Sequence, residues 1–193
     1  MHQETERLIL RPWEARDRQP LRHILGDPIV RRFYPATATP EEVDAQIDNS
    51  ILQAKRDGFH LQAVEFKSSG ELVGLLGLAR LTPLMQSFTK GEVEIGWQFD
   101  KRFWGHGLAP EAARVWLDYA WTVLRLPQVI AYTAVMNVPS QRVMEKIGMV
   151  KDPDGEFDHP KIEAGHPLRR HVVYRITNRA ASGVNPTTAI HEH

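Results

Sequence analysis

Hydrophobic and polar residues alternate along this chain with two different periods, which predict strands and helices respectively. A period of two predicts strands over residues 7–11, 59–66, 72–81, 92–99, 129–135 and 172–176. A period of 3.6, with start and stop signals, predicts helices over residues 17–25, 40–57, 110–124 and 140–147. Because strands and helices intermix, the pattern indicates a single α/β domain with a mixed sheet.

Local signals support the helix boundaries. Thr39 is placed to cap the second helix, Pro40 suits its first position, and Glu42 completes a capping box. Residues 82–91 show no clear period and are predicted to form a long loop. Residues 180–193 are small, polar and aperiodic, so we expect a domain over residues 1–179 followed by a disordered tail.

Composition excludes several function classes. The 193 residues contain 24 Lys and Arg against 24 Asp and Glu, without the basic excess typical of nucleic-acid binders. The chain has no cysteine, which excludes a disulfide framework, a Cys nucleophile and a Cys-ligated metal. The most apolar run, residues 72–81, is too short to span a bilayer, and the first residues do not resemble a signal peptide. We therefore expect a soluble cytoplasmic protein with neither nucleic-acid nor membrane partners.

The candidate chemistry lies between the strand over 92–99 and the strongest helix. There the chain reads Arg102-Phe-Trp-Gly105-His106-Gly107-Leu108-Ala109-Pro110-Glu111. Two glycines permit a sharp turn with exposed N–H groups, and a helix N-terminus follows, so this is a predicted anion site suited to a pyrophosphate. It matches neither a P-loop nor a complete dinucleotide fingerprint, which has Gly or Ala where Pro110 stands. Taken alone, a Gly-x-Gly favours a plain strand-to-helix turn in which the glycines only shape the chain.

Three segments together resemble the GNAT superfamily of N-acetyltransferases. Arg102-x-x-Gly105-x-Gly107, followed by Ala109, looks like the acyl-CoA pyrophosphate motif of that family, and Glu92–Trp97 resembles its central strand. The segment from Asn137-x-x-Ser140 to Met149 resembles the part that follows the fifth strand of these proteins. The resemblance covers about residues 7–176, and the RimJ/RimL-like branch is the most similar.

The resemblance implies a fold, a cosubstrate and a reaction. We expect a GNAT-like single domain with a mixed central sheet, flanked by helices, whose two neighbouring parallel strands splay apart to admit the pantetheine arm of acetyl-CoA. The reaction is then transfer of acetyl to a primary amine, either a protein N-terminus or a small amine, and a homodimer is plausible. The residues implied in acetyl-CoA binding are Ile95, Trp97, Phe99, Arg102, Gly105, His106, Gly107, Leu108, Ala109, Asn137 and Ser140.

Two residues are candidates for catalysis. Glu94 resembles the strand carboxylate of the RimJ/RimL branch and is the candidate base that deprotonates the amine. Its alternative role is that of an exposed or Arg-paired strand residue. Ser140 is the candidate that contacts the thiol end of CoA, and it is also suited to cap a helix. Met144 stands where many relatives carry a Tyr acid, so that role is not expected of this segment.

Other interpretations compete with the enzyme. A non-catalytic acyl-CoA-binding domain would keep the glycine loop and lose the acceptor site, and a module for another nucleotide lacks a complete motif. The histidines at 159, 166 and 171 match no metal-binding spacing, so a polar loop is expected there and no metal. The acceptor is expected to meet residues 29–40, 82–91 and 151–170.

Overall fold

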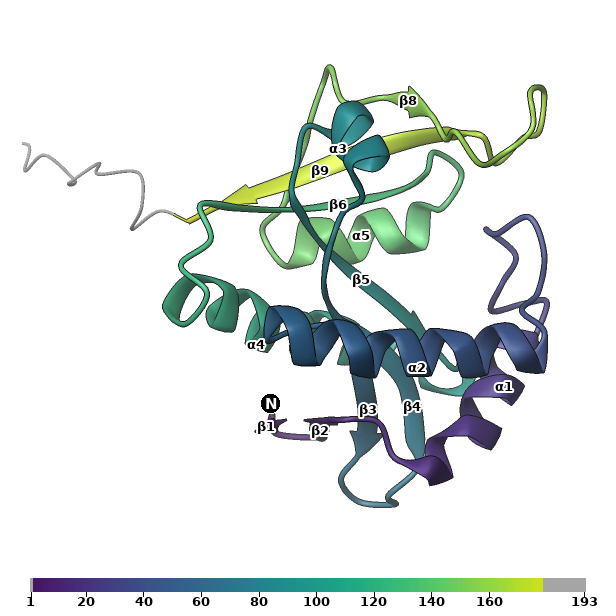
Figure 1. The fold of residues 1–193 in the computed structure, drawn as a ribbon, viewed down its shortest axis with the longest axis vertical. Coiled ribbons are helices and arrows are strands. Elements are labelled where there is room, and N and C mark those ends of the chain that lie inside the picture. Colours follow the sequence, from purple (N-terminus) through teal and green to yellow (C-terminus); the bar gives the residue numbers. More distant parts are fainter. Residues whose placement is uncertain (1, 179–193) are drawn as a thin grey trace, which may run out of the picture.

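The computed structural model describes residues 2–178, and their strands form one mixed sheet (Figure 1). The order is β1-β2-β3-β4-β5-β6-β9-β7, with β8 also paired to β9. Every pairing is antiparallel except that of β5 with β6, which is parallel. The strands are β1 (Gln3–Glu4), β2 (Leu8–Arg11), β3 (Gln62–Phe66), β4 (Leu72–Arg80), β5 (Val93–Phe99), β6 (Gln128–Ala134), β7 (Val150–Lys151), β8 (Phe157–Asp158) and β9 (Arg170–Thr177).

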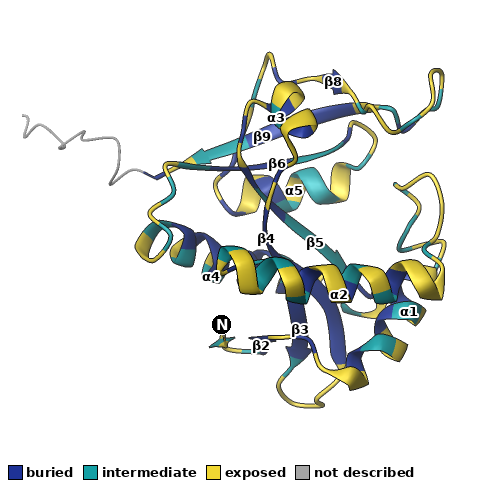
Figure 2. Cartoon of the chain, in the orientation of Figure 1, coloured by how far each residue is buried: buried dark blue, intermediate teal, exposed yellow. Residues whose placement is uncertain are grey.

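Helices cover both faces of this sheet. The short helix η1 (Ala15–Asp17) leads into α1 (Arg18–Gly26), which packs with α2 (Pro40–Asp57) on one face of β3 and β4. On the opposite face α4 (Leu108–Thr122) and α5 (Val138–Lys146) pack against β2 to β6, with Trp116 fully buried between α4 and the sheet. The short helix η2 (Lys101–Phe103) leads from β5 toward α4. The result is the predicted α/β domain with a mixed central sheet flanked by helices, in which β4 is buried along nearly its whole length (Figure 2).

The predicted loop over residues 82–91 is wrong, because α3 (Pro83–Thr89) lies within it. Its signals are local: the Thr82 side chain accepts a hydrogen bond from the Met85 N–H, and Pro83 occupies the first position. Seven residues are too few for a clear hydrophobic period, but Met85 is buried against Ile130 and Phe157. Tertiary packing therefore stabilises a helix that periodicity does not detect.

Other differences concern ends and short strands. Helix α4 begins at Leu108 and not at Pro110, and α5 begins at Val138 and not at Ser140. The two-residue strands β1, β7 and β8 carry no period and were not predicted. The expected tail over 180–193 lies outside the described residues. No helix among residues 2–178 is long and apolar enough to cross a membrane.

Candidate active site

The site is built where β5 and β6 separate. Glu94 is opposite Ile130, and this is the single register pair between the two strands, although β5 continues to Phe99 and β6 to Ala134. Beyond that pair the facing strand edges are unpaired, and Figure 1 shows β5 running diagonally away from β6. The predicted splayed parallel strands are therefore present. Such edges expose N–H and C=O groups that an extended ligand arm can pair with.

A cavity of about 700 Å³ passes through this opening. One end is lined by Gly105, Gly107 and the first residues of α4, together with Asn137 and Ser140 at the start of α5. The other end is lined by the α1–α2 connection, including Tyr34, and by residues beside β8 and β9. The cavity thus joins the two faces of the sheet, with Glu94 on its wall between them.

The glycine loop has the conformation that the anion-site prediction requires. Gly105 and Gly107 have φ of +82° and +76°, in the left-handed region that favours glycine. Within the described chain, the N–H groups of residues 105–109 donate no hydrogen bond to protein. Gly107 is also the N-cap of α4, so the free N–H groups of the loop join those of the first helical turn. Free N–H groups next to the positive end of a helix dipole are the arrangement that the predicted anion site requires.

Arg7, just before β2, holds this loop in place. Its guanidinium donates one hydrogen bond to the His106 carbonyl at 2.9 Å and two to Glu111 at 2.8 and 2.6 Å. Glu111 also accepts from the Thr5 hydroxyl and from the Arg7 N–H. Although burial opposes ionisation, these hydrogen bonds lower the pKa of Glu111. The negative charge of Glu111 at the start of α4 is compensated by the positive charge of Arg7, so it does not repel an anion bound at the loop.

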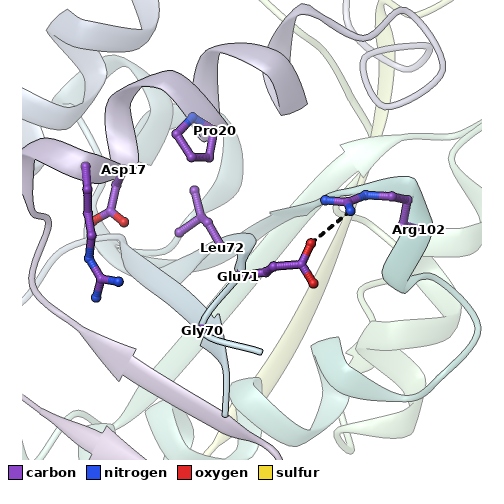
Figure 3. A pocket seen from close by; sticks show the side chains of 7 residues that line it. Asp17, Pro20, Gly70, Glu71, Leu72 and Arg102 are labelled. Carbon is purple, nitrogen blue, oxygen red and sulfur yellow. Dashed lines mark hydrogen bonds and ion pairs between the residues drawn. The ribbon is translucent and has the colours of Figure 1, made fainter. Parts of the chain in front are cut away.

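Arg102 lies elsewhere than the resemblance implies. Its guanidinium pairs with Asp100 at 2.8 Å and with Glu71 at 3.0 Å, and it is absent from the lining of the large cavity. It borders instead a separate pocket of about 260 Å³ beside Pro20 and Leu72 (Figure 3). Its side chain supports the turn that follows β5 and supplies no charge to the glycine loop.

Of the remaining candidates on the loop and on β5, five line the large cavity and one does not. Ile95, Trp97, Phe99, Leu108 and Ala109 all line the large cavity, as the resemblance implies. His106 does not line it, and its carbonyl is the group that Arg7 holds.

Asn137 and Ser140 lie together at the start of α5. Asn137 is the N-cap, since its side chain accepts from the Ser140 N–H at 3.3 Å, and its amide nitrogen donates to the Thr133 hydroxyl at 2.9 Å. The alternative role of Ser140 as a cap is therefore wrong. Within the described chain its hydroxyl makes no hydrogen bond, and Ser140 lines the cavity, so the hydroxyl is available to a ligand.

Glu94 is a half-buried carboxylate with no cationic partner among the ion pairs of residues 2–178. Its neighbour is Tyr132 on β6, whose hydroxyl favours the ionised carboxylate and lowers the pKa of Glu94. Burial is the larger effect and raises the pKa of Glu94 to about 7. Neither an Arg-paired nor a fully exposed strand residue describes it. A carboxylate that titrates near neutrality in a cavity is suited to take up a proton from an amine.

Comparison with known proteins identifies the family. The model of the acetyltransferase (GNAT) domain matches residues 7–150. The chain belongs to the GNAT acetyltransferase family. It is 34% identical to the uncharacterized protein YkkB of Bacillus subtilis over 75% of this chain and 83% of that one. It is 30% identical to the uncharacterized N-acetyltransferase YnaD of the same organism, over 79% and 84%. A solved GNAT acetyltransferase from Bacillus anthracis superposes with a TM-score of 0.75 at 28% identity, covering 92% of this chain and 99% of that one.

Family membership decides between the interpretations left open above. The protein is an acetyl-CoA-dependent N-acetyltransferase, and the non-catalytic alternative is not supported. Acetyl-CoA is the cosubstrate of GNAT proteins, and the free N–H groups at the glycine loop fit its pyrophosphate.

Sequence reasoning missed several residues around Glu94. Tyr132 was read only as part of a strand, although a polar-tipped aromatic residue in an apolar strand is a usable signal. Tyr34 lies in the α1–α2 connection, where its ring stacks on Arg31 at 3.7 Å, and Arg31 donates to Gln98 of β5 at 2.9 Å. His159 and His171, which were read as a polar loop and strand, both line the cavity of this GNAT protein.

Proposed function

We propose that this protein transfers the acetyl group of acetyl-CoA to a primary amine by direct attack, with Glu94 as the general base. The observation that carries the proposal is the position of Glu94, at the point where β5 and β6 separate and on the wall shared by both ends of the cavity. A pKa of about 7 lets the carboxylate take a proton from the amine near neutral pH.

In this mechanism the amine nitrogen attacks the thioester carbonyl carbon while Glu94 receives the proton that the nitrogen loses. The carbonyl oxygen becomes an oxyanion, which an N–H group on the free edge of β5 would stabilise. The C–S bond then breaks, and the products are the N-acetylated amine and CoA. The Ser140 hydroxyl would donate to the departing thiolate, because it lines the cofactor end of the cavity and has no hydrogen-bond partner among residues 2–178.

The cofactor would lie with its pyrophosphate on the N–H groups of the loop over 105–109 and its pantetheine arm between β5 and β6. Ile95, Trp97 and Phe99 would flank that arm, and Asn137 would meet one of its amides. The acceptor would enter from the opposite face, between the α1–α2 connection and the residues beside β8. The acceptor is a small amine or a protein N-terminus, and the RimJ/RimL-like branch and a homodimer stay predictions.

Calorimetric titration with acetyl-CoA, followed by thiol release against a panel of amines, tests this proposal. Binding together with amine-dependent thiol release is the expected result. Binding without release from any amine would remove the transfer reaction, and the absence of binding would remove the cofactor site.

A further inference from the structure

Two histidines lie side by side at the acceptor end of the cavity. His159 follows β8 and His171 lies on β9, with ring centroids 4.9 Å apart. The Tyr132 ring is 6.2 Å from His159 and 6.1 Å from His171, and Phe157 completes the cluster at 6.3 and 5.6 Å. Since Tyr132 is also the neighbour of Glu94 in the cavity wall, the two imidazoles and the candidate base surround the same tyrosine.

Backbone contacts assign a different tautomer to each imidazole. His171 Nδ1 lies 3.0 Å from the Arg169 carbonyl oxygen, which can only accept, so this nitrogen carries the proton. His159 Nδ1 receives the Lys161 N–H at 3.3 Å, so it carries none. In the neutral rings Nε2 is therefore unprotonated in His171 and protonated in His159. Nε2 of His171 is an acceptor, and Nε2–H of His159 is a donor.

The surroundings keep both rings neutral. Burial, with smaller contributions from the neighbouring His171 and Lys161, lowers the pKa of His159 to about 4. Burial also lowers the pKa of His171, although its bond to the Arg169 carbonyl opposes this. Within residues 2–178 neither Nε2 has a hydrogen-bond partner, and both residues line the cavity. One donor and one acceptor therefore remain unused at the acceptor end.

This pair matches one chemical class of ligand group. A carboxamide or peptide group has a carbonyl that accepts and an N–H that donates, which is the complement of the two Nε2 positions. A carboxylate would leave the His171 acceptor without a donor, and a second ammonium, as in a polyamine, would leave the His159 donor without an acceptor. Lys161 beside the pair also disfavours a second cation.

We infer that His159 and His171 are specificity-determining residues, which orient an acceptor whose amine lies next to an uncharged amide group. In this arrangement the amide carbonyl accepts from His159 Nε2–H, the amide N–H donates to His171 Nε2, and the amine meets Glu94. The reaction in this inference rests on the proposed function, but the contacts of the amide with the two histidines can be tested independently of it.

Glycinamide and glycine methyl ester separate the two contacts. Both place a carbonyl next to the amine, so their amines have similar basicity, but the ester lacks the N–H that His171 would receive. We expect kcat/KM about tenfold higher for glycinamide than for the ester, in keeping with one net hydrogen bond. Glycine N-methylamide, whose methyl group is on the amide nitrogen so that it imitates a peptide bond, tests whether a peptide or a primary carboxamide is preferred.

Two variants should respond differently. His171→Phe should abolish the preference for the amide by slowing glycinamide alone, and His159→Phe should slow both substrates about equally. His171→Gln keeps an acceptor oxygen and should restore part of the preference. Propylamine has no carbonyl, so either Phe substitution should slow its acetylation less than that of glycinamide. Acetyl-CoA affinity and circular dichroism establish that each variant is folded.

The results distinguish this inference from the proposed function. If all the amines are acetylated but glycinamide and the ester react equally in the wild-type protein, the inference is wrong and the transferase stands. If the preference survives in folded His171→Phe, it is wrong as well. If no amine is acetylated, glycinamide is titrated into the CoA complex while the imidazole resonances of His159 and His171 are followed. Shifts with glycinamide and none with propylamine support the inference, and equal or absent shifts overturn it.

Discussion

At one end of the cavity the groups offered to a ligand belong to the backbone, and at the other end they belong to side chains. The cofactor end presents the N–H groups of residues 105–109 in a single stretch of chain, shaped by two glycines of positive φ. The acceptor end presents Tyr34, Tyr132, His159 and His171, which come from four separate parts of the chain. Glu94 lies where the two ends meet.

The difference indicates which end is free to diversify. Backbone donors depend on loop shape, so a substitution there acts through conformation and leaves the type of ligand unchanged. Side chains at the acceptor end can be replaced one at a time without altering the sheet that carries Glu94. A protein built this way keeps one cofactor and changes its amine, and variants at each end should therefore have separable effects.

The largest effect is expected at the junction, from Glu94→Gln. The amide cannot take the proton from the amine, so kcat should fall by about 10²- to 10⁴-fold. Acetyl-CoA affinity should stay unchanged, because the carboxylate lies away from the glycine loop. Steady-state kinetics and calorimetry measure the two quantities. Glu92→Gln is the matched control, since Glu92 is an exposed carboxylate two residues earlier, and it should behave as the wild type. Wild-type turnover in Glu94→Gln would exclude Glu94 as the base.

Gly105→Val should break the cofactor end alone. A β-branched residue at φ +82° is strained by about 1–2 kcal/mol, and its side chain would stand before the phosphate-binding N–H groups. Among residues 2–178, and apart from the chain neighbours of Gly105, no heavy atom lies within 4 Å of the added Cβ, so a loss of binding would come from a clash with the ligand. We expect the Kd for acetyl-CoA to rise about a hundredfold, on the order of 3 kcal/mol.

Gly70→Val is the control for Gly105→Val. Gly70 has φ +70°, equally open surroundings and a position in the β3–β4 turn, outside the large cavity. It should lose a similar amount of stability in thermal unfolding and keep its acetyl-CoA affinity. Equal affinities in the two folded variants would contradict the assignment of the loop.

The same contrast explains what the sequence predicts well. The cofactor end is contiguous, so the spacing of Gly105 and Gly107 before a helix, together with the two further segments that resemble the GNAT family, predicted it. The fold was predicted because long elements such as α2 and α4 carry a clear period and strong caps. Arg102 was misplaced because ion pairs with Asp100 and Glu71, the latter remote in sequence, decide where its guanidinium lies.

At the acceptor end the expected segments 29–40 and 151–170 contain Tyr34 and His159. Which side chains meet there was missed, for the opposite reason. Tyr132 meets Glu94 only through the parallel pairing of β5 with β6, and the two histidines meet only through the pairing of β8 with β9. Neither pairing leaves a local signal in the chain. Helix α3, which packs against Ile130 and Phe157, has too few residues to show a period. Residues brought together by tertiary contacts of this kind need a structure to be recognised as a group.

The pH dependence of kcat/KM should also report on the junction. Burial raises the pKa of Glu94 to about 7, so below that pH the carboxyl is protonated and cannot act as a base. Activity should fall about tenfold for each pH unit below 7 and should not fall above 7 on account of this group. Protonation of the amine also lowers kcat/KM at low pH, with a pKa that changes when amines of different basicity are compared. If the pKa of the acidic side of the profile changed in full step with the pKa of the amine, Glu94 would be excluded as the base.

The smallest effect is expected from Arg7→Met, which removes the link between the glycine loop and β2. The substitution frees the His106 carbonyl and leaves the Glu111 carboxylate without its cation at the start of α4, close to the expected phosphates. We expect the Kd for acetyl-CoA to rise about five- to tenfold, near 1 kcal/mol, and less at high salt because charge repulsion is screened. Arg80→Met, which removes another exposed ion-paired arginine, should leave the Kd unchanged. Adding Glu111→Gln to Arg7→Met removes the uncompensated charge but not the disorder of the loop. Full recovery of affinity in the double variant would mean that Arg7 acts through charge alone, and no recovery would mean that it acts by holding the loop.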